Sequence, residues 1–170
     1  MIPWLERTEL LLGSENIEIL QNANVLVVGV GGVGAYAAEM IARAGVGKMT
    51  LADADIVSES NINRQLIALH STVGREKCAV LAERLCDINP ALELTCVSRF
   101  IDESSVDSLL DSAEFDYAVD AIDTLSPKIA LIKGTLDRGI PLVSSMGSGG
   151  KMDPAALEIA DIAKTHHCPL

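Results

Sequence analysis

The sequence predicts an α/β domain with a doubly wound, mainly parallel sheet and an N-terminal helical extension. Three observations lead to this fold class. Apolar runs alternate with amphipathic helical patterns, a glycine-rich segment lies between the first apolar run and the first long helix, and no repeat or low-complexity tract interrupts the order. With 170 residues, 49% of them hydrophobic, the chain can form one domain with a buried core.

A helical extension precedes the sheet domain. Apolar spacing predicts two short helices, at about Ile2 to Leu12 and Ser14 to Asn22, before the first apolar run begins. We therefore divide the chain into an extension at residues 1–22 and a sheet domain at residues 23–170.

Strands and helices alternate through the sheet domain. Gly45 and Gly47 end the first long helix, and Asn89-Pro90 ends the second, because glycine and the residue before proline disfavour further helix. The Gly/Ser-rich loop at 146–151 suits close approach by a ligand or by backbone. The expected strands are 24–29, 48–53, 93–98, 117–121 and 141–145, with a further candidate at 156–161, and the expected helices are 32–44, 74–88, 103–112 and 126–138.

Composition limits the classes of function. The chain carries 24 acidic and 13 basic residues, and its formal charge of −11 disfavours nonspecific attraction to nucleic acid or anionic membrane. No segment has the apolar length of a transmembrane helix, so we expect a soluble, cytoplasmic protein. The four cysteines form no C-x-x-C pair, which predicts reduced thiols. His166, His167 and Cys168 stand together without a distant partner and only weakly indicate a metal site.

A glycine-rich turn, Gly-Val-Gly-Gly-Val-Gly at residues 29–34, follows the first strand and opens a helix, as in Rossmann-like nucleotide-binding folds. Without side chains, its glycines let phosphate or ribose approach backbone N–H groups at the positive end of that helix. Asp53 ends the second strand at the spacing expected for a carboxylate that accepts hydrogen bonds from ribose hydroxyls. The turn alone fits a dinucleotide-binding oxidoreductase equally well. The candidate nucleotide-binding glycines are Gly29, Gly31, Gly32 and Gly34.

The residues after the second strand favour ATP chemistry. This part of the chain resembles the D-x-D-x-V-x-x-S-N-L-x-R-Q pattern of the ThiF/MoeB/HesA superfamily, together with a later lysine. The matching residues are Asp53-Ala54-Asp55-Ile56-Val57, then Ser60-Asn61-Ile62-Asn63-Arg64-Gln65, and then Lys77. These enzymes resemble ubiquitin-activating enzymes and adenylate carboxylates with ATP.

The resemblance implies a role for each residue of this pattern. Arg64 and Lys77 would contact the triphosphate and neutralise charge on the α-phosphate and the departing pyrophosphate, and Asn61 would help to orient the phosphates. Asp55 either belongs to the same nucleotide site or caps the turn that follows it.

Two further segments match the superfamily. Asp120-Ala121-Ile122-Asp123 resembles its D-x-x-D motif, which implies that Asp123 binds Mg²⁺, whereas Asp120 is typical of a structural aspartate at a strand end. The segment Arg7 to Gly13 resembles the stretch whose arginine reaches the ATP of the neighbouring subunit. Arg7 is therefore a candidate arginine finger supplied across a homodimer.

The later motifs are most similar to the tRNA threonylcarbamoyladenosine dehydratase branch of the superfamily. They include Gly147-Ser148-Gly149-Gly150 and Asp161-Ile162-Ala163-Lys164-Thr165. Similarity to that branch implies that the substrate is a tRNA carrying threonylcarbamoyladenosine, whose threonylcarbamoyl carboxylate is adenylated with ATP and then closes a ring. It leaves open a sulfur-relay protein as partner. Because the branch continues beyond this sequence, we expect a C-terminal truncation. Two alternatives stay open: an adenylyltransferase for a ubiquitin-like sulfur carrier, and a dinucleotide-binding oxidoreductase.

Overall fold

The computed structural model, which describes residues 2–166 and 168, contains a five-stranded parallel sheet in the order β3-β2-β1-β4-β5. The order reverses at β1, because the chain runs outward through β2 and β3 and then returns to β4 on the other side. Ligands of such sheets bind outside the carboxyl ends of the strands at this reversal point. The strands are β1 (Asn24–Val28), β2 (Lys48–Ala52), β3 (Glu93–Val97), β4 (Tyr117–Asp120) and β5 (Leu142–Ser144).

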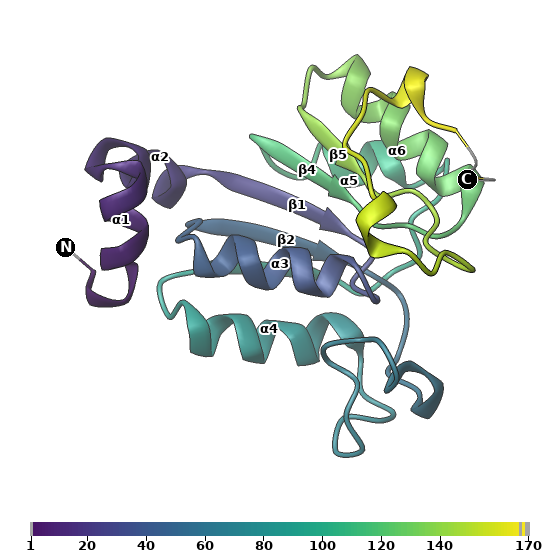
Figure 1. The fold of residues 1–170 in the computed structure, drawn as a ribbon, viewed down its shortest axis with the longest axis horizontal. Helices are drawn as coiled ribbons and strands as arrows, with labels where there is room; N and C mark the ends of the chain where they lie inside the picture. Colours follow the sequence, from purple (N-terminus) through teal and green to yellow (C-terminus); the bar gives the residue numbers. More distant parts are fainter. Residues whose placement is uncertain (1, 167, 169–170) are drawn as a thin grey trace.

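Helices cover both faces of the sheet, which confirms the doubly wound α/β fold (Figure 1). Side chains alternate between the faces along each strand. Val27 of β1 therefore lies in the core under α3 (Gly34–Arg43) and α4 (Lys77–Ile88), whereas Leu26 lies in the core under α5 (Val106–Leu110) and α6 (Leu125–Asp137). Two apolar layers thus fix the sheet from both sides.

The N-terminal extension packs at the amino end of β1, opposite the carboxyl ends of the strands (Figure 1). It contains η1 (Pro3–Leu5), α1 (Glu6–Leu12) and α2 (Ser14–Asn22), as the sequence predicts. A β-carbon at Gly45 would lie 2.8 Å from Leu5 Cδ1, and one at Gly47 would lie 1.7 Å from Gln21 O. The two glycines that end α3 therefore also admit the extension against the sheet domain.

The candidate strand at 156–161 is wrong. Residues 154–156 form a 3-10 turn, and 157–161 have no regular structure, with Leu157 80% and Ile159 98% exposed. A strand needs a neighbour to pair its backbone groups, and this segment pairs with none of the described strands. Helix α4 begins at Lys77 rather than 74, because Glu76 forms an antiparallel bridge with Ile56.

Within residues 2–166 and 168, no helix is long and apolar enough to cross a membrane. The described residues also contain no group of three or more His, Cys, Asp or Glu side chains that could hold a metal ion on their own. Of the three adjacent residues that weakly indicated metal, His167 lies outside the described residues.

Candidate nucleotide site

The glycine turn between β1 and α3 packs tightly against the end of β4. Gly29 has a φ of +86°, and a β-carbon there would lie 2.7 Å from Ala121 O. A β-carbon at Gly34 would lie 1.8 Å from Gly29 O, so neither position admits another residue without a shift of backbone. Helix α3 has no side-chain cap at Val33, which leaves its first backbone N–H groups without a side-chain acceptor.

Gly31 and Gly32 differ from these two positions. A β-carbon at either would meet its nearest neighbour at 3.6 Å, an ordinary van der Waals distance. The fold therefore does not require glycine at these two places. Their missing side chains leave room over the turn, which fits the predicted approach of a nucleotide to the backbone.

Asp53 ties the end of β2 to the glycine turn. Its Oδ2 accepts a hydrogen bond from Val30 N at 2.8 Å, and its Oδ1 accepts one from Asp55 N at 2.8 Å. Each carboxylate oxygen has a further lone pair, so both can still accept bonds from ribose hydroxyls. The structure thus gives Asp53 an organising contact that the sequence did not reveal, and the contact to ribose stays a prediction.

Arg64 reaches the same turn from a distant loop. Its Cγ lies 3.6 Å from the position of a β-carbon on Gly32, and its Nη1 donates to Ser60 O at 3.0 Å and to Asn63 Oδ1 at 2.9 Å. The side chain is exposed, so its remaining N–H donors are accessible to phosphate. The structure therefore brings this predicted cation to the turn.

Asn61 has a local structural role. It ends η2 (Glu59–Asn61), where its Oδ1 accepts from Ser58 N at 3.0 Å as half of a capping box. Its amide group remains a donor, so the contact leaves the predicted phosphate role untested.

Lys77, the first residue of α4, is paired with Asp55. Its Nζ donates to Asp55 Oδ2 at 2.6 Å, and the lysine side chain is 6% exposed while that of the aspartate is 69% exposed. The Asp55 carboxylate therefore holds a nearly buried ammonium. Lys77 keeps two further N–H donors for a ligand.

Asp123 lies in the exposed loop between β4 and α6, directly after the strand end that packs on the glycine turn. Its carboxylate makes one long contact, accepted from Thr124 Oγ1 at 3.5 Å. Mg²⁺ is usually held by one or two carboxylates together with phosphate oxygens and waters, rather than by a cage of protein ligands. The accessible carboxylate of Asp123, two residues after the Ala121 that packs on the glycine turn, fits that mode of binding.

Asp120 is structural, as its position predicts. It is fully buried, and its Oδ2 accepts from Lys128 Nζ at 2.6 Å and from Ser144 Oγ at 2.5 Å. Its Oδ1 accepts from Ile122 N at 3.0 Å, which fixes the start of the loop that carries Asp123. Lys128 was not predicted as a partner of Asp120. It lies on the face of α6 that also carries the buried Leu131 and Thr135, and this helical spacing can be seen in the sequence.

Arg7 does not join this site within one subunit. It is an exposed residue of α1, at the amino end of the sheet, whereas the glycine turn lies at the carboxyl end (Figure 1). The five residues of β1 between the two ends span about 16 Å of strand. Arg7 is therefore separated from its own glycine turn by the length of the sheet.

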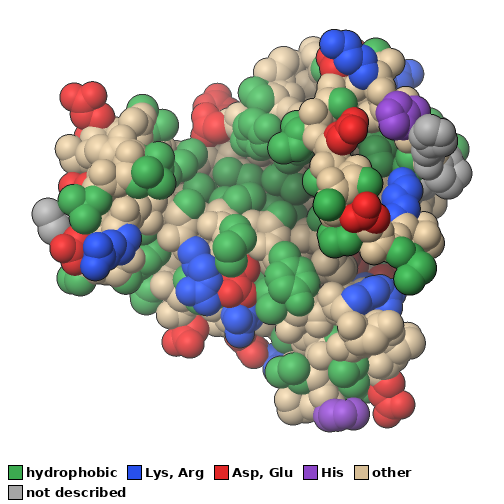
Figure 2. Space-filling view, viewed as in Figure 1, with side chains coloured by type: hydrophobic (Ala, Val, Ile, Leu, Met, Phe, Trp, Pro, Cys, Tyr) green, Lys and Arg blue, Asp and Glu red, His purple; other side chains and the backbone are tan. Residues whose placement is uncertain are grey.

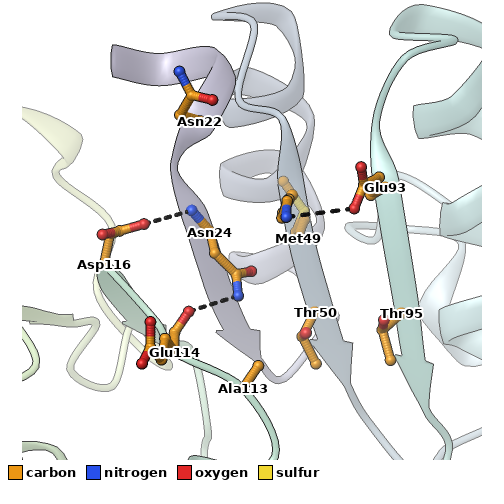
Figure 3. A pocket seen from close by; sticks show the side chains of 10 residues that line it. Asn22, Asn24, Met49, Thr50, Glu93, Thr95, Ala113, Glu114 and Asp116 are labelled. Carbon is orange, nitrogen blue, oxygen red and sulfur yellow. Dashed lines mark hydrogen bonds and ion pairs between the residues drawn. The ribbon is translucent and has the colours of Figure 1, made fainter.

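Two cavities also open at the amino end. One, of about 320 Å³, is lined by residues of the extension, among them Trp4 and Gln21, and by residues of the sheet domain such as Lys48. The other measures about 560 Å³, and Figure 3 shows Asn24 within it, bonded to Asp116 and to the Glu114 backbone. Neither cavity is lined by a residue that the sequence assigns to the nucleotide site; those residues, Arg7 apart, follow the carboxyl ends of the strands or lie in the loop and helix after β2.

Comparison with known proteins identifies the family of this chain. The chain matches the ThiF family over residues 5–169. It belongs to the ThiF family. The ThiF-family chain is 47% identical to a tRNA threonylcarbamoyladenosine dehydratase of Bacillus subtilis (strain 168) over its full length, and 42% identical to one of Escherichia coli (strain K12) over 98% of its length. It spans 66% and 63% of the lengths of these two relatives.

Solved structures agree with the fold. A crystal structure of the E. coli tRNA N6-threonylcarbamoyladenosine dehydratase TcdA, in complex with ATP, superposes with a TM-score of 0.95 at 40% identity and covers 100% of this ThiF-family chain and 71% of that one. The molybdopterin-synthase adenylyltransferase of Escherichia coli (strain K12) is 38% identical over 75% of this chain and half of its own length. The similarity to the dehydratases of Bacillus subtilis and Escherichia coli thus has a higher identity and covers more of this chain.

Proposed function

We propose that this chain uses ATP to adenylate the threonylcarbamoyl carboxylate of tRNA threonylcarbamoyladenosine, which then cyclises. The observation that carries the proposal is the meeting of Asp53, the glycine turn and Arg64 at the carboxyl edge of the sheet. That arrangement occurs in a chain with 47% identity to a tRNA threonylcarbamoyladenosine dehydratase. We place this reaction in the cytoplasm. A sulfur-relay protein is kept as a further candidate partner.

The reaction has two steps. A carboxylate oxygen attacks the α-phosphorus of ATP, and the bond between the α-phosphorus and the oxygen that bridges it to the β-phosphorus breaks. Pyrophosphate departs, and an acyl-adenylate is formed. A neighbouring nucleophilic atom of the same modification then attacks the acyl carbon, loses its proton to solvent, and displaces AMP as the ring closes. Because the second attack is intramolecular, proximity replaces an enzyme nucleophile.

The two cysteines whose pKa is clearly shifted, Cys78 and Cys96, are in keeping with such a step. Burial raises the pKa of the Cys78 thiol to about 12, and its Sγ lies 3.5 Å from Asp53 O, to which it donates. Burial also raises the pKa of Cys96. Both thiols are therefore protonated at neutral pH, and a thiol rather than a thiolate is a poor nucleophile.

The polar groups at the turn would take the following parts. Asp53 would accept hydrogen bonds from the ribose hydroxyls, and Arg64 and Lys77 would neutralise charge that moves onto the departing pyrophosphate. Asn61 would help to orient the phosphates. Asp123 would hold Mg²⁺ together with phosphate oxygens, and the bound ion would supply further charge neutralisation there.

Arg7 would act across a homodimer, since its own turn lies at the other end of the sheet. The surface that faces the viewer in Figure 2 is hollowed between the extension and the α6 side, and hydrophobic side chains gather in the hollow. Val143 of β5 pairs with Val119 of β4 and so shares its face, yet it is 47% exposed because α3 and α4 cover only the other strands. An exposed apolar surface of this kind is typical of an interface. Exposed apolar residues on the extension, α3 and these strands include Leu10, Leu11, Ile19, Tyr36, Met40, Tyr117 and Val143.

The test is substrate-dependent release of AMP. This chain is mixed with ATP, Mg²⁺ and tRNA that carries threonylcarbamoyladenosine, and the conversion of the modified nucleoside is followed by mass spectrometry. The expected result is AMP formation and loss of one water from the nucleoside. AMP formation with a carrier protein ending in glycine, but not with tRNA, would favour the adenylyltransferase instead, and tight binding of NADH without ATP binding would favour an oxidoreductase.

A further inference from the structure

The larger cavity at the amino end of the sheet is lined by a buried hydroxyl group without a protein partner. Thr50, in the middle of β2, is 6% exposed, and its Oγ1 makes no hydrogen bond to any residue that the structure describes. Met49 and Leu51 lie in the core under α3 and α4, so Thr50 points to the opposite face of the sheet. Buried polar groups are normally bonded to protein or to ordered water. The Thr50 hydroxyl is therefore available to a molecule in the cavity.

Three carboxylates line the same cavity. Glu114 and Asp116 lie in the loop before β4, and Glu93 begins β3. Glu93 lies 3.6 Å from the Lys48 ammonium, whereas Glu114 and Asp116 form no ion pair with a described residue. Three carboxylates and one ammonium give the lining a net charge of −2.

The amide side chains of the lining add further acceptors. Asn22 Nδ2 donates to Glu18 O at 2.8 Å, and Asn24 Nδ2 donates to Glu114 O at 2.8 Å. Their side-chain carbonyl oxygens therefore remain available as acceptors. Asp116 uses Oδ2 to accept from Asn24 N at 2.8 Å and keeps Oδ1. An excess of acceptors together with negative charge favours a ligand that carries positive charge and N–H donors.

The spread of these acceptors determines the shape of the cation. The described residues contain no group of three or more His, Cys, Asp or Glu side chains that could hold a metal ion, so the three carboxylates are not a metal centre. In Figure 3, Glu114 and Asp116 lie on one side of the cavity and Glu93 on the other, with Thr50 between them. The cavity measures about 560 Å³, within the range of roughly 300 to 1,000 Å³ for small-molecule sites. A linear polyamine fits this arrangement, because methylene chains separate its ammonium groups.

We propose that this cavity binds a linear polyamine. One ammonium group bonds to Glu114 and Asp116, and the chain runs toward Glu93 past Thr50, whose hydroxyl oxygen accepts a hydrogen bond from an N–H of the polyamine. The site lies at the end of the sheet opposite the glycine turn, so it does not depend on the proposed use of ATP. Its lining joins Asn22, the last residue of α2, to the first three strands. The bound polyamine therefore stabilises the packing of the extension on the sheet domain.

Calorimetric titration with spermidine tests the site. The ionic strength is held constant, because a protein with a formal charge of −11 attracts any cation. Spermidine should bind with a stoichiometry of one, and Mg²⁺ and the monoamine n-butylamine should bind at least about tenfold more weakly. Equal affinities for spermidine and Mg²⁺ would show attraction by net charge alone and would overturn the proposal.

Three variants separate the cavity from the rest of the surface. Glu114→Gln should weaken spermidine binding by about threefold to tenfold, and Thr50→Val, which keeps the shape of the side chain, by about threefold. Thr50→Ser should retain the affinity, because it keeps the hydroxyl.

Glu158→Gln is the matched control. It removes the same charge from an exposed residue outside the lining and should leave the affinity unchanged. Equal losses in Glu114→Gln and Glu158→Gln would contradict the proposal, as would an unchanged affinity in a folded Thr50→Val protein. Glu114 is exposed, so its variant decides the question even if Thr50→Val does not fold.

Discussion

The ammonium of Lys77 lies 2.6 Å from the Asp55 carboxylate, and only the lysine of the pair is buried. A buried charge needs a partner, so Asp55 keeps Lys77 charged and in place at the start of α4. This makes Asp55 a residue that positions the cation. Because its carboxylate is exposed, an incoming triphosphate can share the ammonium with it.

Lys77→Ala is expected to reduce adenylation by roughly a hundredfold or more, because it removes positive charge where negative charge develops. Asp55→Asn should have a smaller effect, since the ammonium remains but loses its ionic anchor. The measurement is the rate of AMP formation under saturating ATP. Lys48→Ala is the matched control, because the Lys48–Glu93 ion pair at 3.6 Å lies at the amino end of the sheet. Equal rates in Lys77→Ala and the wild type would remove Lys77 from the site.

Arg64→Ala should likewise lower the rate by roughly a hundredfold, because the guanidinium beside Gly32 is lost. Arg64→Lys should recover part of the rate, since it restores the charge without paired N–H donors. Arg75→Ala serves as control, as Arg75 forms a surface ion pair with Glu83. Pre-steady-state adenylation is the measurement, and a loss equal to that of Arg75→Ala would contradict the role.

Asp53→Ala is expected to weaken ATP binding by about 1 to 3 kcal/mol, through loss of ribose hydrogen bonds and of the contact to Val30 N. Asp53→Asn should bind better than Asp53→Ala, because its amide oxygen can still accept from Val30. Isothermal titration with ATP measures both. If neither variant loses affinity, the ribose lies elsewhere.

A charged network between α3 and α4 predicts a pH dependence of stability. Arg84 donates to Glu39 Oε2 at 2.6 Å, Arg43 lies 2.8 Å from Oε1, and these arginines, Arg84 foremost, hold the pKa of the buried Glu39 below its usual value. The pKa is lowered in the folded state, so the resulting stability is present above the unfolded pKa of about 4.3 and is lost as the pH falls through the lower folded value.

Glu39→Gln should therefore lower the free energy of unfolding at pH 7 by about 1 to 3 kcal/mol and should flatten its decline below about pH 4. Urea unfolding at a series of pH values measures both effects. Glu83→Gln, which alters an exposed ion pair, should change little. Parallel pH curves for Glu39→Gln and the wild type would show that Glu39 does not contribute this dependence.

Action of Arg7 across a dimer can be tested by mixing subunits. Arg7→Ala and Asp123→Ala proteins should each be inactive, and a mixture should regain activity, because a mixed dimer holds one site with Arg7 from one chain and Asp123 from the other. AMP formation is measured after subunit exchange has been verified by mass spectrometry. No recovery despite exchange would exclude the trans arrangement.

The local features of this protein could be predicted from its sequence. Alternating apolar patterns gave the five strands and the helices to within a few residues, because strand and helix periods are properties of short segments. The glycine turn and Asp53 were recognisable for the same reason, since a phosphate-binding turn needs its glycines at fixed spacing after a strand. The strand expected at 156–161 failed because a strand depends on a partner that local sequence does not supply.

The sequence by itself thus determined the order of elements, the glycine turn and the motif residues that belong near it. Only the tertiary structure decided which of them meet. It placed Arg64 on Gly32, joined Lys77 to Asp55 across 22 residues, buried Lys128 against Asp120, and left Arg7 at the opposite end of the sheet. The physical reason is the distance along the chain over which each preference acts. Turn and helix preferences depend on a few neighbouring residues. The pairing of a buried charge instead depends on side chains that come together only when the two apolar layers pack on the sheet.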